Sequence, residues 1–233
     1  MTFVHGFTQT SRSWDLIIDE LSSTFLCNSL DAPGHGESLN GQRTLPECGE
    51  DIAKSMTTGI LVGYSMGARM ALHTALQHPE KVTQLVLVSG TAGLEDSTDR
   101  AQRCENDNQL ADRLISIGVQ QFLTEWLALP MFAGLTPKTA QMNDRLRNSS
   151  EGLADSLRFA GTGTQEPLWH RLGELSMPVL LIAGENDEKF VQLAQRMQTL
   201  IPTSRLEIVP NSGHTVHLEQ PSQFIRLVTA FAS

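Results

Sequence analysis

The 233-residue sequence has little cysteine and no long apolar run, and each shortage excludes a class of protein. Cys27, Cys48 and Cys104 are odd in number, widely spaced and outside any C-x-x-C pattern, so they predict neither a disulfide framework nor a metal site. No apolar segment is long enough to cross a membrane, and the N-terminus lacks the pattern of a signal peptide. We therefore expect a cytoplasmic protein without membrane insertion.

Positive charge is also scarce. The net charge of −9 argues against nucleic acids and anionic membrane surfaces as partners. Among the basic residues, 13 are arginine and only 4 are lysine. Arginine presents a planar fork that suits carboxylates. An ordinary set of surface arginines would give the same count.

Hydrophobic residues make up 40 % of the chain, which is enough for a sizeable core, and their pattern alternates between strands and helices. We expect strands at residues 2–4, 25–30, 60–62, 85–88, 178–183 and 205–209. We expect helices at residues 14–21, 45–56, 66–78 and 190–200, and from residue 221 onward. Length and pattern together predict one α/β domain over residues 1–233.

The pattern changes from residue 91 to residue 165, where the chain is polar with helical patches and no clear strand. We interpret this segment as a helical lid, inserted into a core formed by residues 1–90 and 166–233. The lid carries Trp126 and six arginines: Arg100, Arg103, Arg113, Arg145, Arg147 and Arg158. The alternative is a solvated helical cap with a small core of its own.

The stretch Gly63-Tyr64-Ser65-Met66-Gly67 lies between a predicted strand and a predicted helix. A strand, a tight turn with serine at its apex and a helix form the context of a nucleophile elbow. The serine sits in a strained backbone conformation that projects its hydroxyl from the end of the sheet. Side chains two residues away on either side would collide with neighbouring elements, so both positions are glycine.

Two further residues complete a possible triad. Asp187 follows a buried strand in Gly184-Glu185-Asn186-Asp187, and His214 follows the last strand in Asn211-Ser212-Gly213-His214. A histidine can take the serine proton, and an acid can hold the imidazole in the right tautomer. Such chemistry needs no metal and no organic cofactor. The rivals are Glu185 and Glu188 for the acid, and His217 for the base.

The order Ser65, Asp187, His214 resembles that of the α/β-hydrolases. His5-Gly6-Phe7 also resembles their turn after the third strand, so the amides of Phe7 and Met66 would form the oxyanion hole. Asp31-Ala32-Pro33-Gly34-His35-Gly36 resembles a common loop of this superfamily, and we expect structural roles for His5 and His35. The resemblance implies a mostly parallel sheet with the lid after the sixth family strand. About six strands are expected here, without the N-terminal hairpin and with the strand at 25–30 as an exposed edge.

More specific pieces resemble the menaquinone-biosynthesis synthases that make 2-succinyl-6-hydroxy-2,4-cyclohexadiene-1-carboxylate. They are His5-Gly6-Phe7-Thr8, Gly63-Tyr64-Ser65-Met66-Gly67-Ala68-Arg69, Arg103-Cys104-Glu105-Asn106-Asp107, Trp126 with Pro130-Met131-Phe132, and the run from Leu157 to Gln165 before Pro167-Leu168-Trp169. The resemblance implies a lyase that eliminates pyruvate from 2-succinyl-5-enolpyruvyl-6-hydroxy-3-cyclohexene-1-carboxylate. Ser65 would then act as a general base and would not be acylated.

The same resemblance implies a small anionic substrate with several carboxylates. Its binding residues would be Arg69, Arg103, Arg147, Tyr64 and Trp126. Arg69 lies one helical turn after Ser65, which places it beside the elbow. For the three arginines the alternative is a surface ion pair. Two other functions stay open: a carboxylesterase or C–C bond hydrolase with Ser65 as nucleophile, and a ligand-binding protein without activity.

Overall fold

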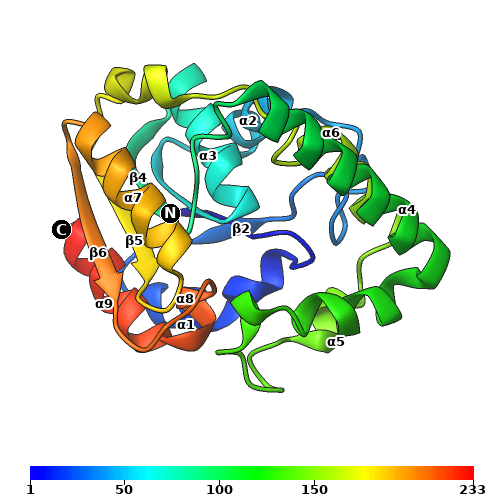
Figure 1. Ribbon diagram of the computed structural model, residues 1–233. Coiled ribbons are helices and arrows are strands. Elements are labelled where there is room, and N and C mark those ends of the chain that lie inside the picture. Colours follow the sequence, from blue (N-terminus) through cyan, green and yellow to red (C-terminus); the bar gives the residue numbers. More distant parts are fainter.

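Six parallel strands form one sheet, in the order β2-β1-β3-β4-β5-β6, in the computed structural model of residues 1–233 (Figure 1). The strands are β1 (Thr2–Val4), β2 (Asn28–Leu30), β3 (Gly59–Tyr64), β4 (Val82–Val88), β5 (Val179–Gly184) and β6 (Ser204–Val209). Each neighbouring pair is parallel. The expected six-stranded sheet is therefore confirmed. The carboxyl ends of all strands lie at one edge, where α/β sheets carry their sites.

The edge strand β2 is shorter than the sequence pattern predicts. Only Asn28–Leu30 pairs with β1, while Phe25 to Cys27 precede the strand. The partner β1 is itself only three residues long, so no ladder is available for a longer β2. As expected, β2 is an edge of the sheet, and its first residue, Asn28, is exposed.

Helices cover both faces of the sheet, because neighbouring strand residues point to opposite sides. On one face, α1 (Asp15–Leu21) and α9 (Pro221–Ala232) pack with Phe3, Val62 and Val86. On the other face, α2 (Leu45–Ser55), α3 (Met66–Gln77) and α7 (Glu188–Leu200) pack with Val4, Leu61 and Leu85. The chain also forms α8 (Val216–Glu219) and two short 3-10 helices, η1 (Ser11–Trp14) and η3 (Trp169–Glu174).

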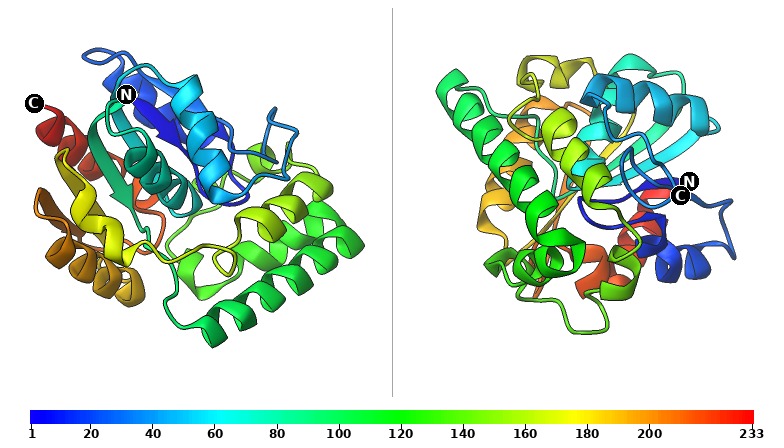
Figure 2. Two further views of the ribbon diagram at one scale, coloured as in Figure 1. Left: turned by 90° about the horizontal axis from the view of Figure 1, so that it is seen from above. Right: turned by 90° about the vertical axis from the view of Figure 1, so that its right-hand side faces the viewer.

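The segment between β4 and β5 forms a separate helical layer, which we call the insert. It contains α4 (Ser97–Leu127), η2 (Pro130–Phe132), α5 (Met142–Arg145) and α6 (Ser150–Ala160). In Figures 1 and 2 these green and yellow-green helices gather on one side of the molecule, away from α9. Ala111, Leu114 and Leu153 belong to a small buried cluster of the insert's own.

Helix α4 is bent at Gly118, where the backbone is not helical. Gly118 has φ = 76°, which glycine adopts readily, and a side chain there would meet no neighbouring atom. The bend turns the last turns of α4, which carry Phe122 and Trp126, back toward the start of the chain, where both rings contact Phe7.

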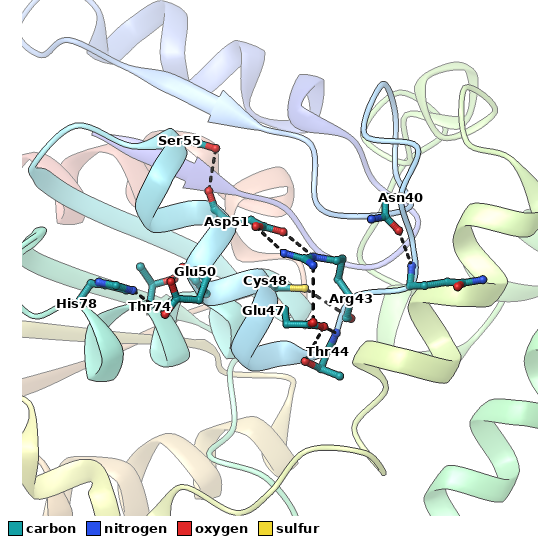
Figure 3. A network of polar contacts seen from close by, with 12 residues as sticks. Asn40, Arg43, Thr44, Glu47, Cys48, Glu50, Asp51, Ser55, Thr74 and His78 are labelled. Atoms are coloured by element: carbon teal, nitrogen blue, oxygen red, sulfur yellow. Dashed lines mark hydrogen bonds and ion pairs between the residues drawn. The ribbon is translucent and has the colours of Figure 1, made fainter.

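Polar contacts order α2 and join it to the end of α3 (Figure 3). Thr44 and Glu47 form a capping box at the start of α2, which satisfies amides that the first turn leaves free. Arg43 donates two hydrogen bonds to Asp51, at 2.8 and 2.7 Å. At the other end of α3, His78 Nε2 lies 2.9 Å from a carboxylate oxygen of Glu50 on α2. The contact between His78 and Glu50 thus ties α2 to the end of α3, the helix that follows Ser65.

Two classes of feature are missing from the fold. None of its helices combines the length and the apolar character that a bilayer crossing requires. No three side chains among the histidines, cysteines and acidic residues are grouped so that they could hold a metal ion.

A buried histidine on α3 predicts how stability depends on pH. Burial, with a smaller contribution from the charges of Arg69 and Arg171, lowers the pKa of His73 from 6.5 to about 4. The unfolded chain therefore binds a proton below pH 6.5 that the folded chain excludes, so acidification reduces the free energy of unfolding. Between pH 7.5 and pH 5, we expect the free energy of unfolding to fall by about 1 to 2 kcal/mol less in His73→Leu than in the unsubstituted protein.

Urea unfolding of both proteins at the two pH values measures this difference. Equal losses of stability in the two proteins would contradict the assignment of His73 as a neutral buried histidine.

Candidate active site

Ser65 occupies a strained turn between β3 and α3. Its φ of 52° and ψ of −107° lie in a region that residues with side chains avoid. The amide of Ser65 donates to the carbonyl of Val88 at 2.8 Å, and its carbonyl accepts from the amide of Arg69 at 3.2 Å. Hydrogen bonds on both sides thus hold the turn, and the side chain projects from the strand's carboxyl end.

The two glycines of the elbow permit close approaches of backbone to backbone. A Cβ at Gly63 would lie 2.7 Å from the Cα of Ala68 in α3. A Cβ at Gly67 would lie 2.5 Å from the carbonyl oxygen of His5 and would also overlap the carbonyl of Val4. The sequence predicts glycine at both positions because any side chain would collide with neighbouring elements, and the structure confirms these collisions.

The structure brings Ser65, His214 and Asp187 together at this edge of the sheet. His214 Nδ1 lies 2.6 Å from Asp187 Oδ2, and His214 Nε2 lies 3.0 Å from Ser65 Oγ. A carboxylate can only accept, so Nδ1–H donates to Asp187 and Nε2 is left to accept from the serine hydroxyl. His214 is almost fully buried, and the rings of Tyr64 and Phe190 pack against it. This arrangement can draw a proton from Ser65.

None of the rival residues takes part in this array. Glu185 accepts from the amide of Asn211, and Glu188 accepts from the side chain of Gln192 on the exposed side of α7. His217 is buried and stacks on Trp14, with ring centroids 4.3 Å apart and no hydrogen-bond partner for either nitrogen. Burial holds the pKa of His217 well below its usual value, so it is a neutral part of the core.

Two backbone amides are available beside Ser65. The amide of Phe7 makes no hydrogen bond within the protein. Met66 is the first residue of α3, where a helix amide lacks a partner inside the helix and where the positive end of the helix dipole lies. The side chains of Phe7 and Met66 line the same cavity as Ser65. The expected oxyanion hole is therefore sterically possible at this position.

The array opens into a cavity of about 900 Å³ between the sheet and the insert. Of its 28 lining residues, 12 are hydrophobic, and apolar atoms form most of the exposed lining. The charged side chains that line it are Arg69, Arg103, Asp107, Arg113, Glu125, Asp187 and Lys189. Such a cavity suits a ligand that carries both a carbon framework and negative charge.

Arg69 is a buried cation on the wall of this cavity. It donates to the carbonyl oxygens of Ala160 at 3.0 Å and Gly161 at 3.3 Å, and it forms no ion pair with a carboxylate. Burial, with a smaller contribution from the nearby charge of Arg103, lowers the pKa of Arg69 to about 10. Arg69 thus remains charged at neutral pH. A surface ion pair, the alternative for this residue, is wrong.

Two arginines of α4 line the cavity with carboxylate partners. Arg103 Nε donates to Asp107 Oδ1 at 2.8 Å, and Asp107 is buried. Arg113 forms a two-point ion pair with Glu125, at 2.9 and 2.7 Å, across the bend at Gly118. Trp126 also lines the cavity, and its buried indole N–H has no hydrogen-bond partner.

The structure does not bring two of the expected binding residues into the cavity. Arg147 is half-exposed and pairs with Glu37 at 3.3 Å, so it forms the surface ion pair that was the alternative for this residue. Tyr64 lies on the face of β3 opposite the cavity, packed against His214 and His217, because strand neighbours alternate between faces. Tyr64 therefore supports the histidine from behind.

Four charged residues of the cavity are not among the sequence-predicted site residues: Asp107, Arg113, Glu125 and Lys189. Asp107 lies four residues after Arg103, a helical spacing that signals a partner. Glu125 lies twelve residues after Arg113, and only the bend in α4 makes them neighbours. Lys189 follows Asp187 by two residues and is exposed at the cavity wall without an ion pair. The position of Lys189 beside the acid is the only sequence signal for it.

The fold and the Ser65 array define the chain as an α/β-hydrolase. The alpha/beta hydrolase family matches residues 3–227. Among solved structures, MenH from S. aureus superposes with a TM-score of 0.93 at 32 % identity and covers 99 % of this chain and 91 % of its own. An esterase from Thermogutta terrifontis superposes with a TM-score of 0.86 at 23 % identity, over 100 % and 90 % of the two chains, which shows the shared fold.

Two curated relatives are similar over nearly the whole chain. A Bacillus subtilis (strain 168) protein, provisionally named 2-succinyl-6-hydroxy-2,4-cyclohexadiene-1-carboxylate synthase, is 40 % identical over 98 % of this chain and 88 % of its own. The synthase of the same name from Enterobacter sp. (strain 638) is 31 % identical over 95 % and 87 %. The chain belongs to the family of 2-succinyl-6-hydroxy-2,4-cyclohexadiene-1-carboxylate synthases within the α/β-hydrolases.

The packing of the elbow predicts the effect of a single methyl group. Gly67→Ala should lower the free energy of unfolding by about 1 to 3 kcal/mol, because its Cβ would overlap the backbone of β1 and of His5. Gly173→Ala is a matched control, since a Cβ there meets only the carbonyl of Leu200 at 3.9 Å. Urea unfolding measures both variants. Equal stabilities for the two would contradict the close packing described for the elbow.

Proposed function

We propose that the protein eliminates pyruvate from 2-succinyl-5-enolpyruvyl-6-hydroxy-3-cyclohexene-1-carboxylate and releases 2-succinyl-6-hydroxy-2,4-cyclohexadiene-1-carboxylate. The observation that carries the proposal is one cavity that holds both the Ser65–His214–Asp187 array and the buried, carboxylate-free Arg69. Family membership supports the same reaction, since relatives that match nearly the whole chain carry the name of this synthase.

The substrate and product names define the bonds that change. The C2–H bond, adjacent to the succinyl ketone, breaks, and the double bond at C3 is replaced by double bonds at C2 and C4. The C5–O bond to the enolpyruvyl group breaks at the same time or afterward. The enolpyruvate that leaves takes up a proton and becomes pyruvate. No water is consumed and no acyl group is transferred.

Ser65 is the general base in this proposal. Its hydroxyl proton passes to His214 Nε2 as Ser65 Oγ removes the C2 proton, and Asp187 stabilises the imidazolium that forms. Negative charge from C2 spreads onto the succinyl carbonyl oxygen. The amides of Phe7 and Met66 would donate to that oxygen.

The cations of the cavity would bind the carboxylates of the substrate. Arg69 has no carboxylate partner of its own, so it can bind one from the substrate through charge-assisted hydrogen bonds. Arg103 is oriented by the buried Asp107 and adds positive charge to the same wall. Trp126 lines the same cavity and can contact the carbon framework of the substrate.

Pyruvate release by the purified protein tests the proposal directly. The protein should release pyruvate from the enolpyruvyl substrate and should hydrolyse p-nitrophenyl acetate poorly. Efficient hydrolysis of the ester without pyruvate release would instead assign the protein as a carboxylesterase with Ser65 as nucleophile.

Ser65→Ala tests the base. The variant should fold normally and lose pyruvate release by at least about 10³-fold, because no other group in the cavity is placed to relay a proton to His214. Steady-state kinetics with the enolpyruvyl substrate measures the loss, and circular dichroism checks the fold. Turnover within tenfold of the unsubstituted protein would remove Ser65 from the mechanism.

Arg69→Met tests carboxylate binding. Loss of a charge-assisted contact should lower kcat/KM by about 10- to 100-fold, while Arg69→Lys should fall in between because it retains the charge. Arg171→Met is the control, since Arg171 pairs with Glu174 outside the cavity. An unchanged kcat/KM in Arg69→Met would show that Arg69 only supports the carbonyls of Ala160 and Gly161.

A further inference from the structure

A second buried arginine without an ion-pair partner lies on the insert. Arg145, the last residue of α5, is 1 % exposed and forms no ion pair. Its guanidinium donates to the hydroxyl of Thr8 and, from Nε, to the carbonyl of Ala140 at 2.8 Å. Burial lowers the pKa of Arg145 to about 10, so it is still charged at neutral pH. Burying a charge without an opposite partner lowers the stability of the fold, so a role for the contacts of Arg145 is expected.

The partner of Arg145 is the strained residue of the oxyanion turn. Thr8 has φ = 68°, a left-handed conformation that is unfavourable for a β-branched residue. All three of its polar groups are bonded. Its amide donates to His35 Nε2 at 3.3 Å, its hydroxyl accepts from Arg145, and its carbonyl accepts from Asn148 Nδ2 at 2.8 Å. The surroundings thus force a conformation that the residue alone would avoid.

Asn148 connects the same turn to a second loop. Its Oδ1 accepts from the amide of Gly36 at 2.8 Å while its Nδ2 donates to Thr8. A further bond runs from the hydroxyl of Thr10 to Asp144, at 2.7 and 2.8 Å to its two oxygens. Residues 144–148 of the insert therefore contact both the turn after β1 and the loop after β2.

These contacts act one residue away from the proposed oxyanion donor. The peptide that joins Phe7 to Thr8 follows the amide of Phe7 directly, so the φ of Thr8 limits where that amide can lie. The preceding amide, that of Gly6, is held separately by the side chain of Gln9 at 3.0 Å. None of Thr8, Arg145 and Asn148 lines the cavity, so none of them is placed to contact a substrate.

We propose that Arg145 and Asn148 are positioning residues for the reaction: they hold Thr8 in its left-handed conformation and thereby place the amide of Phe7 toward the developing oxyanion. This inference rests on the proposed function, because it assigns a task to the oxyanion hole named there. The insert thus acts on the chemistry through the backbone of the turn after β1. Small displacements of a reacting or stabilising group are enough to slow an enzyme substantially.

Kinetics of Arg145→Met and Asn148→Ala test the proposal. Each should lower kcat for pyruvate release by about 10- to 100-fold with KM changed less than threefold, because the amide stabilises the transition state and not the bound substrate. Arg158→Met is the matched control on the same insert, since Arg158 pairs with Asp112 on the surface. It should retain kcat and KM.

A second substitution separates positioning from general stability. Glycine adopts positive φ without steric cost, so in Thr8→Gly the turn can keep its conformation without the contacts from Arg145 and Asn148. The double variant Thr8→Gly/Arg145→Met should have a kcat at least fivefold higher than that of Arg145→Met, when both are measured well below their Tm. A loss of stability alone would not be reversed in this way.

Two results would overturn the inference. The first is a kcat of both single variants within twofold of the unsubstituted protein. The second is a loss of kcat that follows the Tm of the variants and shows no recovery with Thr8→Gly. If the unsubstituted protein released no pyruvate, the proposed function would fail. The same comparison would then be made on p-nitrophenyl acetate, whose hydrolysis uses the same two amides.

Discussion

The site depends on the strained backbone of Ser65 and on the packing that enforces it. A left-handed conformation at a residue with a side chain costs about 1 to 3 kcal/mol and persists only when its surroundings determine it. Here the surroundings are backbone: α3 lies against Gly63, and the end of β1 lies against Gly67. The same contact that strains Ser65 also brings the turn after β1, with Phe7, to the serine. The nucleophile elbow and the oxyanion turn are therefore one packed unit.

Buried positive charge is the second constraint, and two arginines supply it in different ways. Arg69 faces the cavity and bonds only to carbonyls, which leaves its charge for a ligand. Arg145 faces away from the cavity and bonds to the oxyanion turn. Arg69 is oriented by two carbonyls of the insert, those of Ala160 and Gly161, and Arg145 belongs to the insert itself. The insert thus contributes more than a cover over the cavity.

The sequence predicts the strands and the Ser65–His214–Asp187 array because each has a local signal: a short apolar run, a glycine-flanked serine, or an acid and a histidine after a strand. It does not separate Arg145 from Arg147. Helix α5 has only four residues, too few for a periodic pattern to show which arginine is buried. Tyr64 is different, because strand alternation with Val62 places it on the face opposite the cavity. The bend at Gly118 had only an isolated glycine as its signal.

The central claim is that Ser65 acts as a base and removes the C2 proton of the substrate. The most direct measurement is the kinetic isotope effect on kcat/KM with substrate that carries deuterium at C2, combined with the intact mass of the protein during turnover. The account predicts that kcat/KM for the deuterated substrate is well below that for the substrate with ordinary hydrogen at C2, and that no covalent adduct forms. Equal rates together with an acyl group on Ser65 would contradict it.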